Sequence, residues 1–82
     1  MIRVFYKPNC KACLMTTHFF IVHHIKFIDI DLSQSPQYAK SLHDKGHLKV
    51  PVVITDTEEW SGFRPDKLNQ LLQKQRLMRV ER

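Results

Sequence analysis

Residues 4–13 read Val-Phe-Tyr-Lys-Pro-Asn-Cys-Lys-Ala-Cys. An apolar run typical of a β-strand ends at Lys7, a Pro-Asn pair breaks it, and a helix-like stretch begins at Cys10. Cys10 and Cys13, the only cysteines in the chain, therefore lie three residues apart at or just before a helix start. The N–H groups and the positive dipole end of a helix stabilise an anion, so a thiol in this place has a depressed pKa and reacts as the thiolate. Lys7 and Lys11 flank the pair and favour the same thiolate, so the stretch predicts a reversible disulfide.

Length and composition predict one small soluble domain. The chain has 82 residues, of which 43% are hydrophobic and 26% charged, values ordinary for a globular protein. No apolar run approaches the roughly 18 residues of a membrane span, and the N-terminus enters a strand pattern with no signal-peptide core. Two cysteines cannot build the multi-bridge scaffold of a small secreted domain. We therefore expect a cytoplasmic protein that does not associate with membranes.

The order of apolar patterns predicts an α/β fold. Nearly unbroken apolarity over residues 2–6 is typical of a central strand covered on both faces. Residues 11–24 read as a helix whose expected buried stripe contains Leu14, Thr17 and Ile21 at helical spacing and is widened by Met15 and Phe20. Residues 25–31 alternate and predict a second strand, which completes a right-handed βαβ unit.

The second half of the chain continues this order. Ser35 followed by Pro36 predicts a helix start, with Tyr38, Ala39 and Leu42 as its buried face and Gly46 as its stop. Residues 50–54 predict a third strand and residues 58–61 a short edge strand. A last helix is expected to follow Pro65 and to bury Leu68, Leu71, Leu72 and Met78. The full order is β-α-β-α-β-β-α.

Positive charge is concentrated at the C-terminus. The net charge is +5, and residues 74–82 contribute +3 of it through Lys74, Arg76, Arg79 and Arg82 against Glu81. We divide the chain into a domain over residues 1–75 and a basic tail over residues 76–82. The tail is interpreted as a solvated chain end or as a means of steering an acidic partner. No nucleic-acid-binding motif accompanies the charge.

Zinc offers a second interpretation of the cysteines. The spacing from Cys10 and Cys13 to His18 and His23 is that of a zinc knuckle, which in a basic chain would indicate a nucleic-acid-binding module. If residues 11–24 are helical, five residues turn the chain about 140° past a full revolution, so Cys13, His18 and His23 diverge. We therefore expect no metal site, and the five histidines are assigned to surface or helix-end positions.

A later segment carries a resemblance to a known family. Residues 60–66, Trp-Ser-Gly-Phe-Arg-Pro-Asp, resemble the W-S-G-F-R-P segment of the NrdH-redoxins, which are glutaredoxin-like proteins. Together with the C-x-x-C pair and Val50-Pro51, the pattern over residues 2–72 is similar to the thioredoxin fold. The resemblance implies a four-stranded mixed sheet flanked by three helices, with a cis peptide between Val50 and Pro51 that faces the active site.

The resemblance also implies an activity. NrdH-redoxins are dithiol-disulfide oxidoreductases that supply electrons to class Ib ribonucleotide reductase and are reduced by thioredoxin reductase at the expense of NADPH. On this basis we expect no bound cofactor, a monomer, and the reductase's large subunit as partner. Glutathione-dependent glutaredoxin activity is the alternative. It is disfavoured because Ser61, Gly62, Phe63 and Arg64 occupy the place of the glutathione-binding Gly-Asp segment.

Roles for the site residues follow. Cys10 is the expected nucleophile and Cys13 the resolving thiol. Pro51 is expected to shape a docking groove, with the Val50 backbone pairing with an incoming chain. Trp60, Phe63 and Arg64 form either a docking surface or a clamp on the last loop.

The pair of residues between the cysteines departs from the family pattern, which usually has an apolar residue followed by Gln before the second cysteine. This chain has Lys11-Ala12 between its cysteines. Lys11 is expected to stabilise the Cys10 thiolate and so to raise the reduction potential somewhat.

Overall fold

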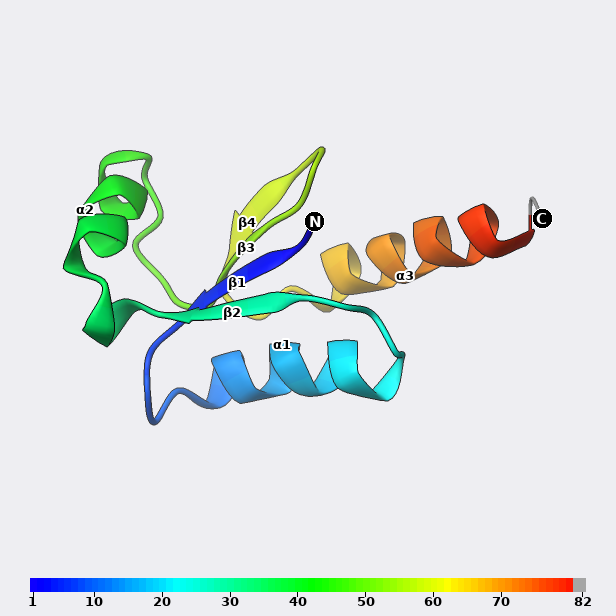
Figure 1. The fold of residues 1–82 in the computed structure, drawn as a ribbon, viewed down its shortest axis with the longest axis horizontal. Helices are drawn as coiled ribbons and strands as arrows, with labels where there is room; N and C mark the ends of the chain where they lie inside the picture. The colour runs from blue at the N-terminus through cyan, green and yellow to red at the C-terminus, as the bar shows by residue number, and fades with distance from the viewer. Residues whose placement is uncertain (81–82) are drawn as a thin grey trace.

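The computed structural model describes the backbone of residues 1–80 and the side chains of residues 1–77. In chain order the elements are β1 (Arg3–Tyr6), α1 (Lys11–Val22), β2 (Ile28–Asp31), the 3-10 helix η1 (Leu32–Gln34), α2 (Pro36–Asp44), β3 (Val52–Ile54), β4 (Glu59–Ser61) and α3 (Pro65–Val80). The predicted β-α-β-α-β-β-α order is confirmed, with η1 as the one additional element (Figure 1). No helix among the described residues is long and apolar enough to cross a membrane.

The four strands form one mixed sheet in the order β2-β1-β3-β4. β1 pairs with β2 in parallel and with β3 in antiparallel orientation, and β3 pairs with β4 in antiparallel orientation. Neighbouring residues of a strand point to opposite faces, and in β1 both Val4 and Phe5 are buried. The expectation of a central first strand covered on both faces is therefore correct.

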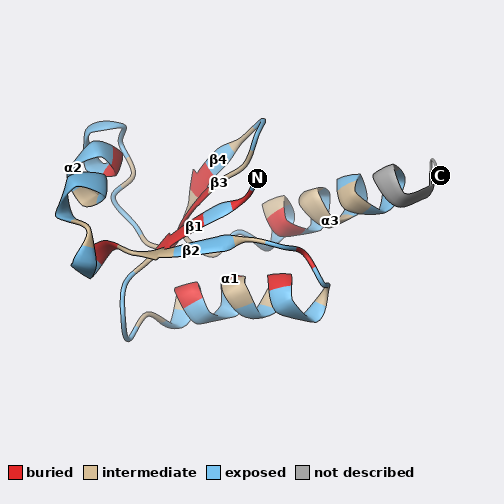
Figure 2. Ribbon diagram, viewed as in Figure 1, coloured by how far each residue is buried: buried red, intermediate tan, exposed pale blue. Residues whose placement is uncertain are grey.

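Helices cover both faces of the sheet. On one face Val4 and Val53 pack with Phe20 of α1 and Leu68 of α3 in the larger core cluster. On the other face Phe5 and Val52 pack with Leu32 of η1 and Leu42 of α2. Figure 2 shows buried residues along β1, β3 and β4 and on the helices, whereas β2 at the sheet edge has none. The sheet is thus held between α1 and α3 on one side and α2 on the other.

The predicted buried stripe of α1 is wrong except at Phe20. Cys13, Thr16 and Phe20 face the core, whereas Leu14 and Ile21 are more than 60% exposed. The helix is apolar nearly all round, so two adjacent rows of side chains at helical spacing could each pack against the sheet. The row that contains the bulky Phe20 is the one that does so. Thr16 can be buried because its Oγ1 donates a hydrogen bond of 2.9 Å to the carbonyl oxygen of Ala12.

All four strands are shorter than expected, β1 and β4 by one residue and β2 and β3 by more. β2 begins at Ile28 and not at Ile25, because its partner β1 begins at Arg3, the residue that pairs with Ile28. Ile25 is nevertheless buried in the core. β3 begins at Val52, which leaves Val50 and Pro51 in the segment that leads into it.

The α2 helix differs from expectation at two residues. Ser35 stands at the N-cap position, but its side chain makes no capping hydrogen bond. Tyr38 is 46% exposed, although the centre of its ring lies 5.8 Å from that of Phe5, so it does not belong to the buried face. The predicted stop at Gly46 is confirmed: its φ is +96°, and the next amide, His47 N–H, donates to the Leu42 carbonyl at 3.0 Å.

The last helix enters the segment that we set apart as a tail. α3 continues through residue 80, and the Lys74 ammonium lies 3.6 Å from a carboxylate oxygen of Glu58. Four other residues named for this end of the chain fall outside the described part of the structure. For Met78 and Arg79 this applies to the side chains, and for Glu81 and Arg82 to the whole residues. The division at residue 75 stays a prediction.

Candidate redox site

Cys10 and Cys13 form a disulfide at the start of α1. Cys10 is the N-cap residue with extended backbone, and its Sγ accepts a hydrogen bond of 3.1 Å from the Cys13 amide. Cys10 is half-buried, whereas Cys13 is only 3% exposed. The sulfur at the surface is therefore also the one that receives a helix N-terminal N–H group, the arrangement that stabilises a thiolate after reduction.

The loop before Cys10 sets this placement. Pro8 ends the strand, and Asn9 takes a left-handed backbone conformation with φ of +61°, which asparagine tolerates better than most residues. The chain thereby turns from β1 into α1 within a few residues. Lys7 and Lys11, predicted to flank the pair, are both exposed beside it.

A cavity of about 340 Å³ opens onto both cysteines. Besides the cysteines and the Lys7–Asn9 loop it is lined by Tyr6, Leu14, Thr17, Ile21, Phe27 and Asp29. None of these six was predicted as a site residue. Asp29 lies on β2, which pairs in parallel with β1, the strand that leads into the cysteine loop.

Val50 and Pro51 adjoin the segment over residues 60–64. The Val50–Pro51 peptide bond is cis, as the resemblance implied. Pro51 is buried, Val50 is half-buried, and the Gly62 amide donates a hydrogen bond of 2.8 Å to the Pro51 carbonyl. Ser61 pairs with Val52 across β3 and β4. The two segments predicted for docking are therefore joined through the sheet.

Trp60 belongs to the core. It is 4% exposed, pairs with Val53 in the sheet and packs in the cluster that contains Phe20 and Leu68, against which half-buried Phe63 also lies. Its indole Nε1 is buried and finds no hydrogen-bond partner in the part of the chain that the structure describes. Of the two interpretations of Trp60, docking surface or clamp, burial favours the clamp.

Arg64 is exposed and engages its own loop. Its Nε and Nη2 donate hydrogen bonds of 3.0 and 2.8 Å to the two carboxylate oxygens of Asp66, in the first turn of α3. Hydrogen bonding from Arg64, supported by the Lys67 amide, lowers the pKa of Asp66 to about 2. The Arg64–Asp66 pair thus fixes the loop where it enters α3.

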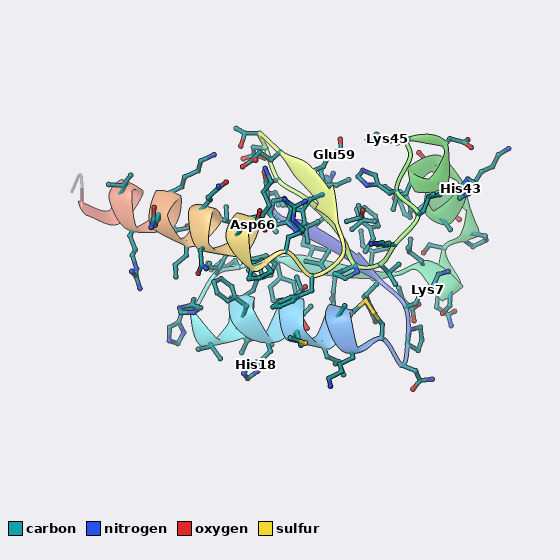
Figure 3. All side chains as sticks on the ribbon, turned by 180° about the vertical axis from the view of Figure 1, so that it is seen from behind. Lys7, His18, His43, Lys45, Glu59 and Asp66 are labelled. Atoms are coloured by element: carbon teal, nitrogen blue, oxygen red, sulfur yellow. A yellow bond between two sulfur atoms is a disulfide. The ribbon has the colours of Figure 1, made fainter. Side chains whose placement is uncertain are left out.

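The histidines do not assemble a metal site with the cysteines. Within residues 1–77 no three His, Cys, Asp or Glu side chains stand close enough to hold a metal ion. His18 lies on the solvent side of α1 (Figure 3), and His23 packs against the ring of Phe19 at 4.4 Å. The geometry gives the zinc-knuckle interpretation no support.

An accessible sulfur and a buried sulfur, three residues apart at a helix start, define a thiol-disulfide oxidoreductase site. Comparison with known proteins agrees. The glutaredoxin family model matches residues 2–60. The glutaredoxin-like protein NrdH of Lactococcus lactis subsp. cremoris is 32% identical over 71 residues, which cover 87% of this chain and 99% of that protein. The solved structure of the glutaredoxin-like NrdH-redoxin from Escherichia coli matches with a TM-score of 0.83 at 33% identity, over 85% of this chain and 92% of that one.

A further relative is the SPbeta prophage-derived thioredoxin-like protein YosR of Bacillus subtilis, 30% identical over 85% of this chain and 91% of that protein. The chain therefore belongs to the glutaredoxin family and, within it, to the NrdH-type redoxins of thioredoxin fold.

Proposed function

We propose that this redoxin is the electron donor of a class Ib ribonucleotide reductase, acting on its large subunit, and is itself reduced by thioredoxin reductase with NADPH. Similarity to the NrdH proteins over most of both chains supports this assignment. We place the protein in the cytoplasm as a monomer without a bound cofactor. A reducing compartment is where a dithiol carrier can be kept in its active form.

The difference in exposure between the two sulfurs is the observation that carries the mechanism. The half-buried Cys10 thiolate attacks one sulfur of the client disulfide, and a Cys10–client disulfide forms while the other client sulfur leaves as a thiol. The buried Cys13 thiol then loses its proton and attacks Cys10 Sγ. This closes the Cys10–Cys13 disulfide and releases the second client thiol, so two electrons pass to the client.

Glutathione is the less favoured electron source. The segment over residues 60–66 is occupied by a buried Trp60, a half-buried Phe63 and an Arg64 held by Asp66. These side chains stabilise the loop and the helix behind it, and leave fewer groups to recognise a tripeptide.

Deoxyribonucleotide formation by a class Ib ribonucleotide reductase tests the proposal. With NADPH and thioredoxin reductase present, addition of the redoxin should support multiple turnovers, and the Cys10→Ser variant should support none. Cys13→Ser should instead accumulate a disulfide to the large subunit, detected by mass spectrometry and lost on addition of dithiothreitol. Continued turnover with Cys10→Ser, or trapping by Cys10→Ser and not by Cys13→Ser, would contradict the assigned roles.

A further inference from the structure

A second hollow lies beside the disulfide, between the β1–α1 loop and the chain that leads from α2 into β3. Its volume is about 110 Å³. The side chains of Lys7, His43, His47 and Lys49 line it together with Val50 and other apolar residues, and no carboxylate is among its lining residues. We call this hollow the basic groove.

Charge within the basic groove is only partly neutralised. Glu59 accepts from His47 Nε2 at 2.7 Å and lies 3.4 Å from the Lys45 ammonium. The hydrogen bond from His47 is the main cause that lowers the pKa of Glu59, which keeps this carboxylate charged. Lys7 and Lys49, in contrast, make no ion pair within the described part of the chain.

The basic groove adjoins the redox site at Lys7. Lys7 lines both the groove and the cavity that opens onto Cys10 and Cys13. Figure 3 shows Lys7 beside the disulfide and His43 above it on α2. Lys49 directly precedes Val50, and its Cδ passes 3.8 Å from the position that a Cβ on Gly62 would occupy. A chain docked on the disulfide that extends toward α2 therefore meets two unneutralised lysines.

The opposite side of the disulfide has a different charge. There the cysteine cavity, which Lys7 lines where it meets the groove, is lined by Asp29 of β2 together with apolar residues such as Leu14 and Phe27. An acidic partner segment is favoured on the α2 side and disfavoured on the β2 side.

From this asymmetry we propose that the basic groove recognises client polypeptides that carry Asp or Glu residues next to their reducible disulfide. The inference rests on the proposed function and names the substrate class of the same site. The acidic residues of the client lie over Lys7 and Lys49 while its disulfide meets Cys10 Sγ. Electrostatic complementarity of this kind acts mainly on association, so kcat/KM for acidic clients should be raised and should fall with salt.

Two synthetic disulfide peptides of one sequence test the proposal, one with Asp and Glu beside the disulfide and the other with Asn and Gln. At low ionic strength we expect kcat/KM about threefold to tenfold higher for the acidic peptide, the range for a few exposed charge pairs. The ratio should approach one at about 1 M salt, where the screening length falls to about 3 Å.

Lys49→Gln should lower the ratio by at least about twofold. The matched control is Lys26→Gln, which removes the same charge from the exposed segment between α1 and β2 and should leave the ratio unchanged.

Equal kcat/KM for both peptides at low salt, or an equal loss in the Lys26→Gln variant, would overturn the inference while leaving the redoxin function intact. Faster reduction of glutathione disulfide than of the acidic peptide would also overturn it, because the groove would then accept a free tripeptide and not a polypeptide. If the redoxin, reduced beforehand with dithiothreitol that is then removed, fails to reduce either peptide, the proposed function itself is refuted.

Discussion

Replacement of Trp60 distinguishes a structural clamp from a docking residue. Trp60 is 4% exposed and sits among Val4, Phe20 and Leu68, so truncation to Ala should destabilise the fold by about 3–5 kcal/mol. A domain of 82 residues has a total stability of roughly 4–12 kcal/mol. Trp60→Ala therefore removes a quarter or more of it, enough to unfold part of the protein if the total stability is near the lower end of this range. Trp60→Phe is the more informative change.

The cost of Trp60→Phe follows from the buried indole. Phenylalanine lacks two of the ring carbons, a loss of about 1.5 kcal/mol at about 0.8 kcal/mol for each buried carbon. It also lacks the Nε1–H group, which is buried without a partner among the described residues and which costs about 1–3 kcal/mol to keep there. The two effects oppose each other, so the unfolding free energy should change by less than about 1.5 kcal/mol.

Urea unfolding followed by far-UV circular dichroism measures this change. Fluorescence is unsuitable because Trp60 is the only tryptophan in the chain. For a clamp, kcat/KM toward a disulfide client should stay within about twofold of the parent, whereas loss of a binding hot spot costs at least about 2 kcal/mol, or more than tenfold. Native stability combined with a tenfold loss of kcat/KM would refute the clamp. A loss of 3 kcal/mol or more in stability would refute the account of the indole N–H.

Two further predictions concern exposed charge and helix packing. The Asp66 carboxyl should titrate with a pKa of about 2 in a carboxyl ¹³C NMR experiment, and Arg64→Gln should move this pKa back toward 3.8. Because the pKa of Asp66 is lower in the folded than in the unfolded state, the stabilisation by the Arg64–Asp66 pair is fully present above about pH 4 and is lost as the pH falls through about 2. An Asp66 pKa that Arg64→Gln does not change would contradict this assignment. On α1, Phe20→Ala should lower the unfolding free energy by about 3–5 kcal/mol and Leu14→Gln by less than about 0.5 kcal/mol, since Phe20 is fully buried and Leu14 is 68% exposed. Similar urea midpoints for these two variants would show that the orientation of α1 is wrong.

Local signals in the sequence were sufficient to predict where the redox-active cysteine pair lies in the fold. A proline and an asparagine between an apolar strand and a run without breakers place Cys10 and Cys13 at a helix start, whatever the rest of the chain does. Continuous apolarity around Val4 and Phe5 likewise predicts a strand buried on both faces, since only such a strand needs apolar residues at successive positions.

The side of α1 that faces the sheet, and the direction of the Trp60 side chain, depend on tertiary contacts that the pattern of apolar residues in the sequence does not contain. Leu14 and Ile21 are as apolar as a core stripe requires, and only packing of Phe20 against the sheet decides that they face solvent. The residues 60–66 motif is equally compatible with an exposed or a buried tryptophan. The pairing of Trp60 with Val53 is what turns it inward.

The source of electrons tests the central claim most directly. NADPH consumption would be followed while the protein reduces insulin, with either thioredoxin reductase or glutathione plus glutathione reductase as the electron supply. We predict steady turnover with thioredoxin reductase, its loss in the Cys10→Ser variant, and little turnover with glutathione. Turnover with glutathione alone would contradict the account and would identify the protein as a glutathione-dependent glutaredoxin.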